Sequence, residues 1–76
     1  MSGKLPAVTG ADVVRALERA GFAVIRIRSS HHIMQHPDGR MTVVSVHAGE
    51  TIGPGLISKI LRDCGMDRGQ FRSFLR

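Results

Sequence analysis

Apolar residues recur every three or four positions between residues 13 and 20, and charged residues fall between them. This spacing places an apolar stripe along an α-helix and leaves its other face to solvent. Thr9 precedes the run with Asp12 three residues later, which is the arrangement of a capping box at a helix N-terminus. Gly21 follows the run, where helices commonly end. The pattern predicts an amphipathic helix that packs against a core and carries no chemistry.

Three short segments rich in β-branched residues follow, at residues 22–28, 31–36 and 41–47. In the first segment Arg26 and Arg28 alternate with isoleucines, so we expect both guanidinium groups on one face of a strand. The connections between the segments are too short for a parallel crossover. The three segments therefore predict an antiparallel meander.

A second helical run starts at Pro54, because proline suits the first position of a helix, and it stops at Gly65. Asp67 then has the form of an N-cap for a short last helix. The complete order is α-β-β-β-α with a short extra C-terminal helix. We expect an α+β fold in which both long helices cover one face of a three-stranded antiparallel sheet. A chain of 76 residues makes a single domain, residues 1–76.

The chain is strongly basic, with eleven Lys and Arg against six Asp and Glu and a formal net charge of +5. Most of the cations are arginines, whose planar guanidinium groups match the geometry of phosphate. A small basic domain suggests a polyanionic partner, and nucleic acid is the first candidate. An arginine-rich composition throughout a GC-rich proteome would give the same numbers, so charge by itself does not decide the function.

Cys64 is the only cysteine, which excludes an intramolecular disulfide and favours a reducing compartment. Its place on the apolar side of the second helix predicts a buried thiol. The N-terminal residues contain no apolar run long enough for a signal peptide or a membrane span. We therefore expect a cytoplasmic protein with no membrane partner.

Three of the four histidines lie close together, directly after the arginine-bearing segment. Imidazole exchanges protons near neutral pH. RNA cleavage needs one group to accept the 2′-hydroxyl proton and another to protonate the leaving 5′-oxygen. His31 follows the bend Ser29-Ser30, so a phosphate held by Arg26 and Arg28 would lie near its ring. The residues alone leave a catalytic and a structural role for His31 equally open.

The other histidines carry weaker signals. His32 faces away from His31 in a regular strand, so only one of the two can reach a substrate. His36 precedes a Pro-Asp-Gly turn, and we expect it to cap that turn or pack at the sheet edge. His47 is a candidate second acid or base or a phosphate donor, with a structural hydrogen bond as the alternative. A zinc site from His32, His36 and His47 fits no standard spacing, and no metal or other cofactor is expected.

The position of Lys59 and the small number of aromatic residues bear on how the chain would bind nucleic acid. Lys59 is expected on the outer face of the second helix, where it either extends the basic surface or is an ordinary solvated charge. The chain has no Trp or Tyr, and its three Phe fit core positions, so stacking of single-stranded bases is disfavoured. Double-stranded RNA is recognised mainly through its backbone and 2′-hydroxyl groups, which a surface of arginine, histidine and serine can contact.

Taken together, the motifs give a sequence that resembles HicA, the small toxin of bacterial HicA–HicB toxin–antitoxin pairs. The resemblance covers roughly residues 9–66 and depends on the order and spacing of several short stretches. These are Ala20-Gly21-Phe22, Arg28-Ser29-Ser30-His31-His32, His36-Pro37-Asp38-Gly39-Arg40, Val43-Val44-Ser45-Val46-His47, Ile52-Gly53-Pro54-Gly55-Leu56 and Ile60-Leu61-Arg62-Asp63-Cys64-Gly65.

The resemblance implies a fold like that of double-stranded-RNA-binding domains and a translation-independent mRNA endoribonuclease with one essential histidine. That histidine corresponds to His31. In the family it commonly follows Gly-Ser or Gly-Gly, whereas this chain has Ser29 at the first of the two positions. Met34 stands where an aromatic residue is frequent. The resemblance also implies a HicB-like antitoxin that covers the active face and blocks RNA.

We therefore expect the toxin of a type II toxin–antitoxin pair, a metal-independent mRNA interferase in which His31 is the general acid or base. The residues expected to bind RNA are Arg26, Arg28, Ser30, Arg40, His47 and Lys59. Two alternatives stay open. One is a non-catalytic double-stranded-RNA-binding module of the same fold, and the other is a basic adaptor that docks an acidic protein. Composition does not separate the three.

Overall fold

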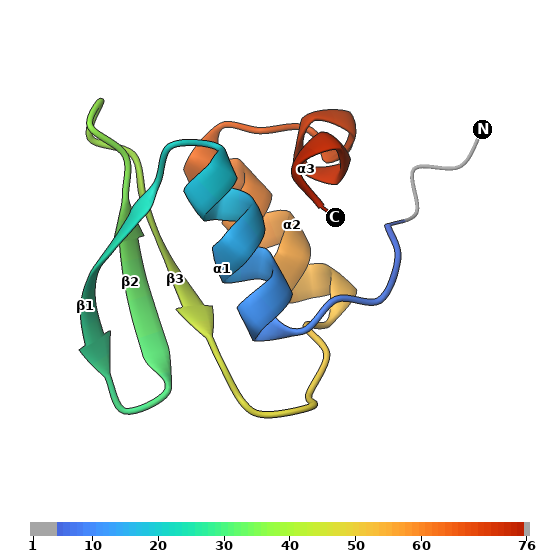
Figure 1. The fold of residues 1–76 in the computed structure, drawn as a ribbon. Helices are drawn as coiled ribbons and strands as arrows, with labels where there is room; N and C mark the ends of the chain where they lie inside the picture. The colour runs from blue at the N-terminus through green and yellow to red at the C-terminus, as the bar shows by residue number, and fades with distance from the viewer. Residues whose placement is uncertain (1–4, 76) are drawn as a thin grey trace.

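A computed structural model describes residues 5–75 of the chain. The elements in chain order are α1 (Gly10–Arg19), β1 (Ala23–Arg28), β2 (His31–Gln35), β3 (Met41–Ser45), α2 (Pro54–Cys64) and α3 (Arg68–Phe74) (Figure 1). The predicted order of helices and strands is confirmed. Each strand is one or two residues shorter than predicted, because the flanking residues leave the sheet. Phe22 enters the core, and His36 begins the turn between β2 and β3.

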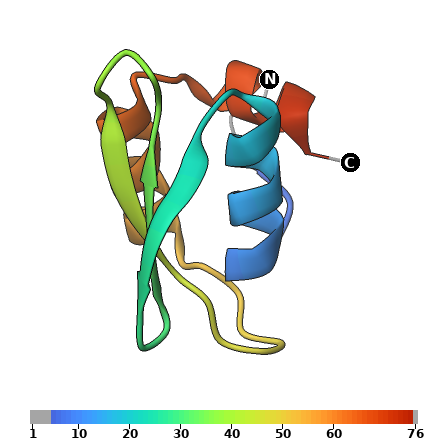
Figure 2. The same ribbon diagram turned by 60° about the vertical axis from the view of Figure 1, so that its left-hand side comes forward.

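The three strands form one antiparallel sheet in the order β1-β2-β3. Figure 1 shows that α1 and α2 lie on the same side of this sheet and that its other face is left open, and in the turned view of Figure 2 the strands pass in front of α2. The predicted α+β arrangement, with both long helices on one face, is confirmed.

The register of the strands decides which side chains share a face. Met34 in β2 lies opposite Thr42 in β3, and His31 lies opposite both Arg28 in β1 and Ser45 in β3. Directly opposite residues project from the same side of a sheet. Met34 and Thr42 are buried against the helices. The alternation of side chains along β2 therefore places His31, Arg28 and Ser45 on the open face.

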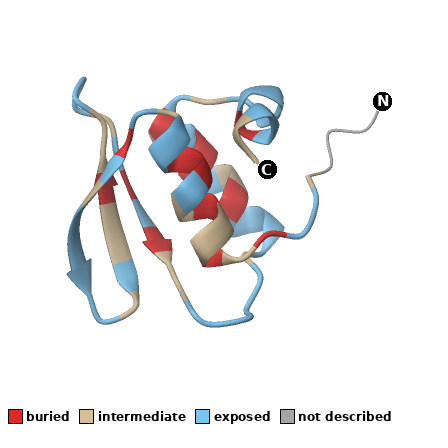
Figure 3. Ribbon diagram, in the orientation of Figure 1, coloured by how far each residue is buried: buried red, intermediate tan, exposed pale blue. Residues whose placement is uncertain are grey.

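The core fills the space between the helices and the sheet, and burial follows this layer (Figure 3). Its largest fully buried side chains are Phe71, Leu17, Met34, Ile60, Val13, Val44 and Cys64. Removing each large apolar side chain from water stabilises the fold by roughly 1.5–3 kcal/mol. Phe71 comes from α3, so the last helix belongs to the core. Cys64 is buried as predicted, and this burial raises the pKa of its thiol to about 11.

The predicted capping box at Thr9 and the predicted N-cap at Asp67 are both present. The Thr9 hydroxyl accepts from the backbone N–H of Asp12, whose carboxylate accepts from the Thr9 N–H in return. Asp67 and Gln70 make the same reciprocal pair at the start of α3. α2 begins with proline and ends at Gly65, which has a φ of 64°. None of the described helices is long and apolar enough to cross a membrane.

Gly10 brings the start of α1 against the end of β3. It is buried, and a Cβ atom at this position would collide with the carbonyl oxygen of Ser45 and with the backbone of Val46. Only a residue without a side chain permits such an approach. Because Ser45 lies opposite His31, this contact helps to position the end of the sheet that carries His31.

Candidate active site

His31 is the first residue of β2, and its side chain is exposed on the open face of the sheet. Within residues 5–75 no hydrogen bond or ion pair engages its ring. The ring is therefore accessible to a ligand that approaches the open face. A buried His31 would have excluded the role that the sequence predicts.

Arg26 and Arg28 lie on the same face as His31. Arg28 is directly opposite His31 and Arg26 is opposite Ile33, which confirms that the two guanidinium groups share a face. A register irregularity between Val24 and Arg26 inserts one extra residue into β1. After this bulge, both arginines lie opposite residues of β2 that project from the open face. Both side chains are exposed, and neither guanidinium is engaged by a partner in the described part of the chain. They are free to bind an anion.

A two-residue turn, Ser29-Ser30, places His31 next to Arg28. Ser29 has a φ of 57°, the only positive φ of a non-glycine residue within residues 5–75. A positive φ at the first position of a two-residue hairpin loop is typical of a type II′ turn, where glycine is preferred. This chain has serine where such a turn favours glycine.

Ser30 anchors the turn to β3. Its carbonyl oxygen accepts from the backbone N–H of Val46 at 2.8 Å and lies 3.4 Å from Nδ1 of His32. His32 is opposite the buried Val44, so its side chain is on the helix side of the sheet. Of the two adjacent histidines, His31 alone projects from the open face.

His47 reaches the same end of the sheet as His31, as the antiparallel arrangement predicts. Its Nε2 atom lies 3.3 Å from the Ser30 hydroxyl oxygen, and its side chain is exposed. The contact joins the residue after β3 to the residue before β2. Ser30, His31 and His47 thus form one group with the arginines of β1.

Arg40 lies at the opposite end of the sheet, in the turn between β2 and β3. Its guanidinium donates to both carboxylate oxygens of Asp38, at 3.1 and 2.8 Å, and to the carbonyl oxygen of Cys64. It also lies 5.3 Å from the centroid of the Phe22 ring. Hydrogen bonds from Arg40 lower the pKa of Asp38 to about 2. The structure therefore does not bring Arg40 to His31, and its contacts give it a structural role at this turn.

His36 caps the turn beside Arg40, which is one of the two roles predicted for it. Its Nδ1 accepts from the backbone N–H of Asp38 at 3.1 Å, and its ring makes an edge contact with Phe22. Gly21, whose φ is 100°, leaves room for the other ring nitrogen. His36 is thereby fixed at the far end of β2 from His31.

Lys59 also lies away from His31, on α2. Its amino group forms an ion pair with Asp63 at 2.9 Å, and Asp63 accepts a hydrogen bond from Thr42 in β3. The hydrogen bond from Lys59, with one from Thr42, lowers the pKa of Asp63. Lys59 therefore belongs to the contact between α2 and β3 and is not part of the group around His31.

The zinc alternative gains no support, and Met34 offers no surface to a base. Within residues 5–75 no three His, Cys, Asp or Glu side chains gather in an arrangement that could hold a metal ion. His36 lies at the other end of the sheet from His32 and His47. Met34 is completely buried in the core, so it cannot contact a base.

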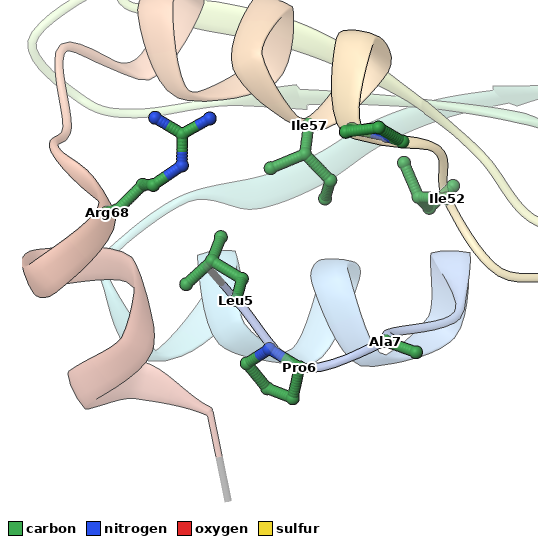
Figure 4. A pocket seen from close by; sticks show the side chains of 7 residues that line it. Leu5, Pro6, Ala7, Ile52, Ile57 and Arg68 are labelled. Atoms are coloured by element: carbon green, nitrogen blue, oxygen red, sulfur yellow. The ribbon is translucent and has the colours of Figure 1, made fainter. Parts of the chain in front are cut away.

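An apolar cavity of about 710 Å³ lies on the helix side of the molecule, away from the histidines. Figure 4 shows Leu5, Pro6 and Ala7 on one side of it, and Ile52, Ile57 and Arg68 on the other. No member of the group around His31 lines this cavity. The chemistry that the sequence predicts therefore belongs to the open sheet face.

Sequence reasoning missed Ser45 and the apolar part of the open face. Ser45 lies directly opposite His31, and Met41 and Val43 share its face with exposures of 46% and 41%. Alternation within the third segment predicts which residues share a face of the strand, but it does not indicate which of the two faces is exposed to solvent. The register with β2 supplies that information.

A comparison with family models identifies the chain. A model of the HicA toxin of bacterial toxin–antitoxin systems matches residues 10–66. The chain belongs to the HicA toxin family. The HicA match runs from the first residue of α1 to just past α2, so it includes the whole group around His31 and leaves out α3. A comparison with curated proteins gave no significant match. As a HicA toxin, the protein is one half of a toxin–antitoxin system and has an antitoxin as its counterpart.

Proposed function

We propose that the chain is an mRNA endoribonuclease in which His31 transfers a proton during cleavage. One observation carries the proposal: the exposed His31 ring lies opposite Arg28, whose guanidinium has no partner within residues 5–75. A phosphate held by Arg28 and Arg26 would have its ester oxygens beside an imidazole. Imidazole gives and takes protons near neutral pH, as strand cleavage requires.

In the proposed reaction, the 2′-oxygen of a ribose attacks the adjacent phosphorus and the bond to the 5′-oxygen of the next nucleotide breaks. One group removes the 2′-hydroxyl proton, and a second group protonates the leaving 5′-oxygen. His31 supplies one of these transfers. His47 is the best-placed second group, because Ser30 holds its ring at the same end of the sheet. Arg26 and Arg28 would offset the negative charge that develops on the phosphate oxygens.

The form of the open face supports structured mRNA as the substrate. Arginine, serine and histidine side chains project from one end of a sheet, and they suit contacts with phosphate and 2′-hydroxyl groups. The chain has no Trp or Tyr to stack a series of unpaired bases. We propose that the enzyme acts on mRNA in the cytoplasm and that its reaction uses no metal ion.

The apolar residues of the same face support a protein partner. Met41 and Val43 are nearly half exposed, and they lie beside Ile33 across the β2–β3 pair. Contacts with phosphate do not require such side chains, whereas protein interfaces bury them. We propose that a HicB-like antitoxin covers this face and thereby blocks RNA.

The test of the proposed function is His31→Ala. The variant should lose RNA cleavage and growth inhibition, while its affinity for RNA changes little. If the wild-type protein binds RNA and never cuts it, the chain is a binding module. If the affinity does not depend on salt concentration, the phosphate contacts are absent and an adaptor function is favoured.

A further inference from the structure

A hollow of about 250 Å³ opens beside the group around His31, where β3 passes into the loop that precedes α2. Figure 1 shows this loop at the same end of the molecule as the turn between β1 and β2. The residues that line the hollow are Ser45, His47, Glu50, Thr51, Ile52, Gly53 and Leu56. None of them except His47 was assigned a role in RNA binding above.

The hollow starts next to the proposed scissile phosphate. Ser45, which lines it, is directly opposite His31 in the β2–β3 pair. Neighbouring strands are about 4.8 Å apart. His47 lines the hollow as well, and its ring contacts Ser30 in the turn before His31. A nucleotide whose phosphate lies at His31 can therefore place its base in the hollow.

Glu50 is the one acidic residue among those that line the hollow. Its carboxylate is exposed, and within residues 5–75 no donor or cation engages it. The Glu50 backbone N–H donates to the carbonyl oxygen of His47 at 3.0 Å, which fixes the loop as a tight turn. A free carboxylate repels the phosphate chain and accepts hydrogen bonds only. It is suited to the N–H edge of a base.

Part of the lining of the hollow is apolar. Ile52 packs against the core with part of its side chain exposed, and Leu56 in the first turn of α2 is 38% exposed. Aliphatic side chains can cover the face of a planar ring. The hollow thus combines the Glu50 carboxylate and the polar side chains of Ser45, His47 and Thr51 with an apolar surface, and the volume suits a single base.

We propose that this hollow binds one unstacked guanine of the RNA, next to the phosphate that is cleaved. The N1–H and N2–H groups of guanine present two parallel donors, which match the two carboxylate oxygens of Glu50. Adenine and cytosine present an amino group beside a ring acceptor, and the acceptor would face the carboxylate. Uracil offers one N–H between two carbonyl oxygens. The site would therefore select guanine over the other three bases.

The inference rests on the proposed function for the position of the RNA, but binding can be measured without cleavage. The probes are two short RNA hairpins that carry a 2′-deoxynucleotide at the cleavage position, so that no 2′-hydroxyl is available for attack. One hairpin has guanine next to that position and the other has adenine. We expect the wild-type chain to bind the guanine hairpin roughly tenfold more tightly, as is typical of one good bidentate pair.

Two variants make the test specific. Glu50→Gln should remove most of the preference for guanine, because the amide replaces one of the two acceptor oxygens by an N–H donor that would face a donor of guanine. Glu18→Gln, which makes the same change on the exposed side of α1, should keep the full preference. In NMR titrations with the guanine hairpin, the amide signals of Glu50 and Ile52 should shift, and they should shift less with the adenine hairpin.

The possible failures are distinct. Equal affinity for the two hairpins, or an unchanged preference in Glu50→Gln, would overturn the guanine site and leave the proposed nuclease function intact. If neither hairpin binds at low salt, the proposed function itself fails. If guanine is preferred but wild-type protein cleaves no RNA that contains 2′-hydroxyls, the base site stands and the nuclease function does not.

Discussion

His31 and Arg28 face each other across the β1–β2 pair, and both side chains project from the sheet face that the helices leave open. Only the turn Ser29-Ser30 separates them along the chain. The proposed proton-transfer group and the proposed phosphate-binding group are therefore held together by one local hairpin. The end of β3 adds Ser45 and His47 to this pair.

If Arg26 and Arg28 each bind a phosphate, replacing either by Gln should weaken RNA binding and make it less dependent on salt. The slope of log affinity against log salt concentration should fall by about one for each lost contact. Fluorescence anisotropy with labelled RNA measures this, in a His31→Ala background that prevents cleavage. Arg62→Gln removes the same charge from the exposed side of α2 and should have a smaller effect. Equal effects of all three changes would show that only net charge matters.

His47→Gln should lower kcat by roughly 10²–10⁴-fold, the usual contribution of a positioned acid or base, with a smaller change in KM. The wild-type pH–rate profile should vary between about pH 5 and 8, and the variant should lose one limb of it. Arg28 lies opposite His31, and Glu50 lines the same hollow as His47. His36→Gln, at the far end of β2, is the control and should keep both limbs. A full profile in His47→Gln would remove His47 from the mechanism.

Ser29→Gly should stabilise the fold by about 1 kcal/mol. A left-handed backbone conformation is strained for a residue with a side chain and costs roughly 1–2 kcal/mol, which glycine avoids. Part of the gain is lost because glycine is more flexible in the unfolded chain. Urea unfolding measures the change, and Ser29→Val should shift stability in the opposite direction. A destabilised Ser29→Gly variant would contradict the turn conformation described for this residue.

The unfolding free energy should fall when the pH is lowered from about 4 to 2. Arg40 holds the pKa of Asp38 at about 2 in the folded chain, below its ordinary value of 3.8. A depressed folded-state pKa contributes stability above the unfolded-state pKa, and this contribution is lost as the pH falls through the folded value. Asp12 and Asp63, whose pKa values are also lowered, act in the same direction. Urea unfolding at pH 5 and pH 2.5 should show a smaller difference for Asp38→Asn than for the wild-type chain.

The local parts of the fold were predictable because their causes are local. Periodic apolar residues predicted the helices, and the capping residues Thr9 and Asp67 predicted where two of them begin. Alternation of side chains predicted that Arg26 and Arg28 share a face. An exposed His31 was expected on the condition that helices cover only one face of the sheet. The family resemblance was visible from motif order and is confirmed by the match over residues 10–66.

Arg40 and Lys59, two of the residues expected to bind RNA, are engaged by other parts of the folded chain. Arg40 looked free in the sequence, but its guanidinium binds Asp38 and the carbonyl oxygen of Cys64, 24 residues away. Lys59 is likewise held by Asp63, which bridges to Thr42 in β3. The position of Ser45 opposite His31 depends on strand register. The pairs Arg40–Asp38 and Lys59–Asp63 join residues two and four positions apart. The contacts with Cys64 and Thr42 depend instead on how the sheet meets α2, which sequence spacing does not encode.

The packing of Gly10 against Ser45 has a genetic consequence. Even one methyl group at position 10 would push the start of α1 against the strand end that supports His31. In a selection for cells that survive production of the toxin, we therefore expect escape alleles at codon 10 alongside those at codon 31. Such alleles would inactivate the toxin by a change in the helix layer, while every exposed side chain of the open sheet face stays unchanged.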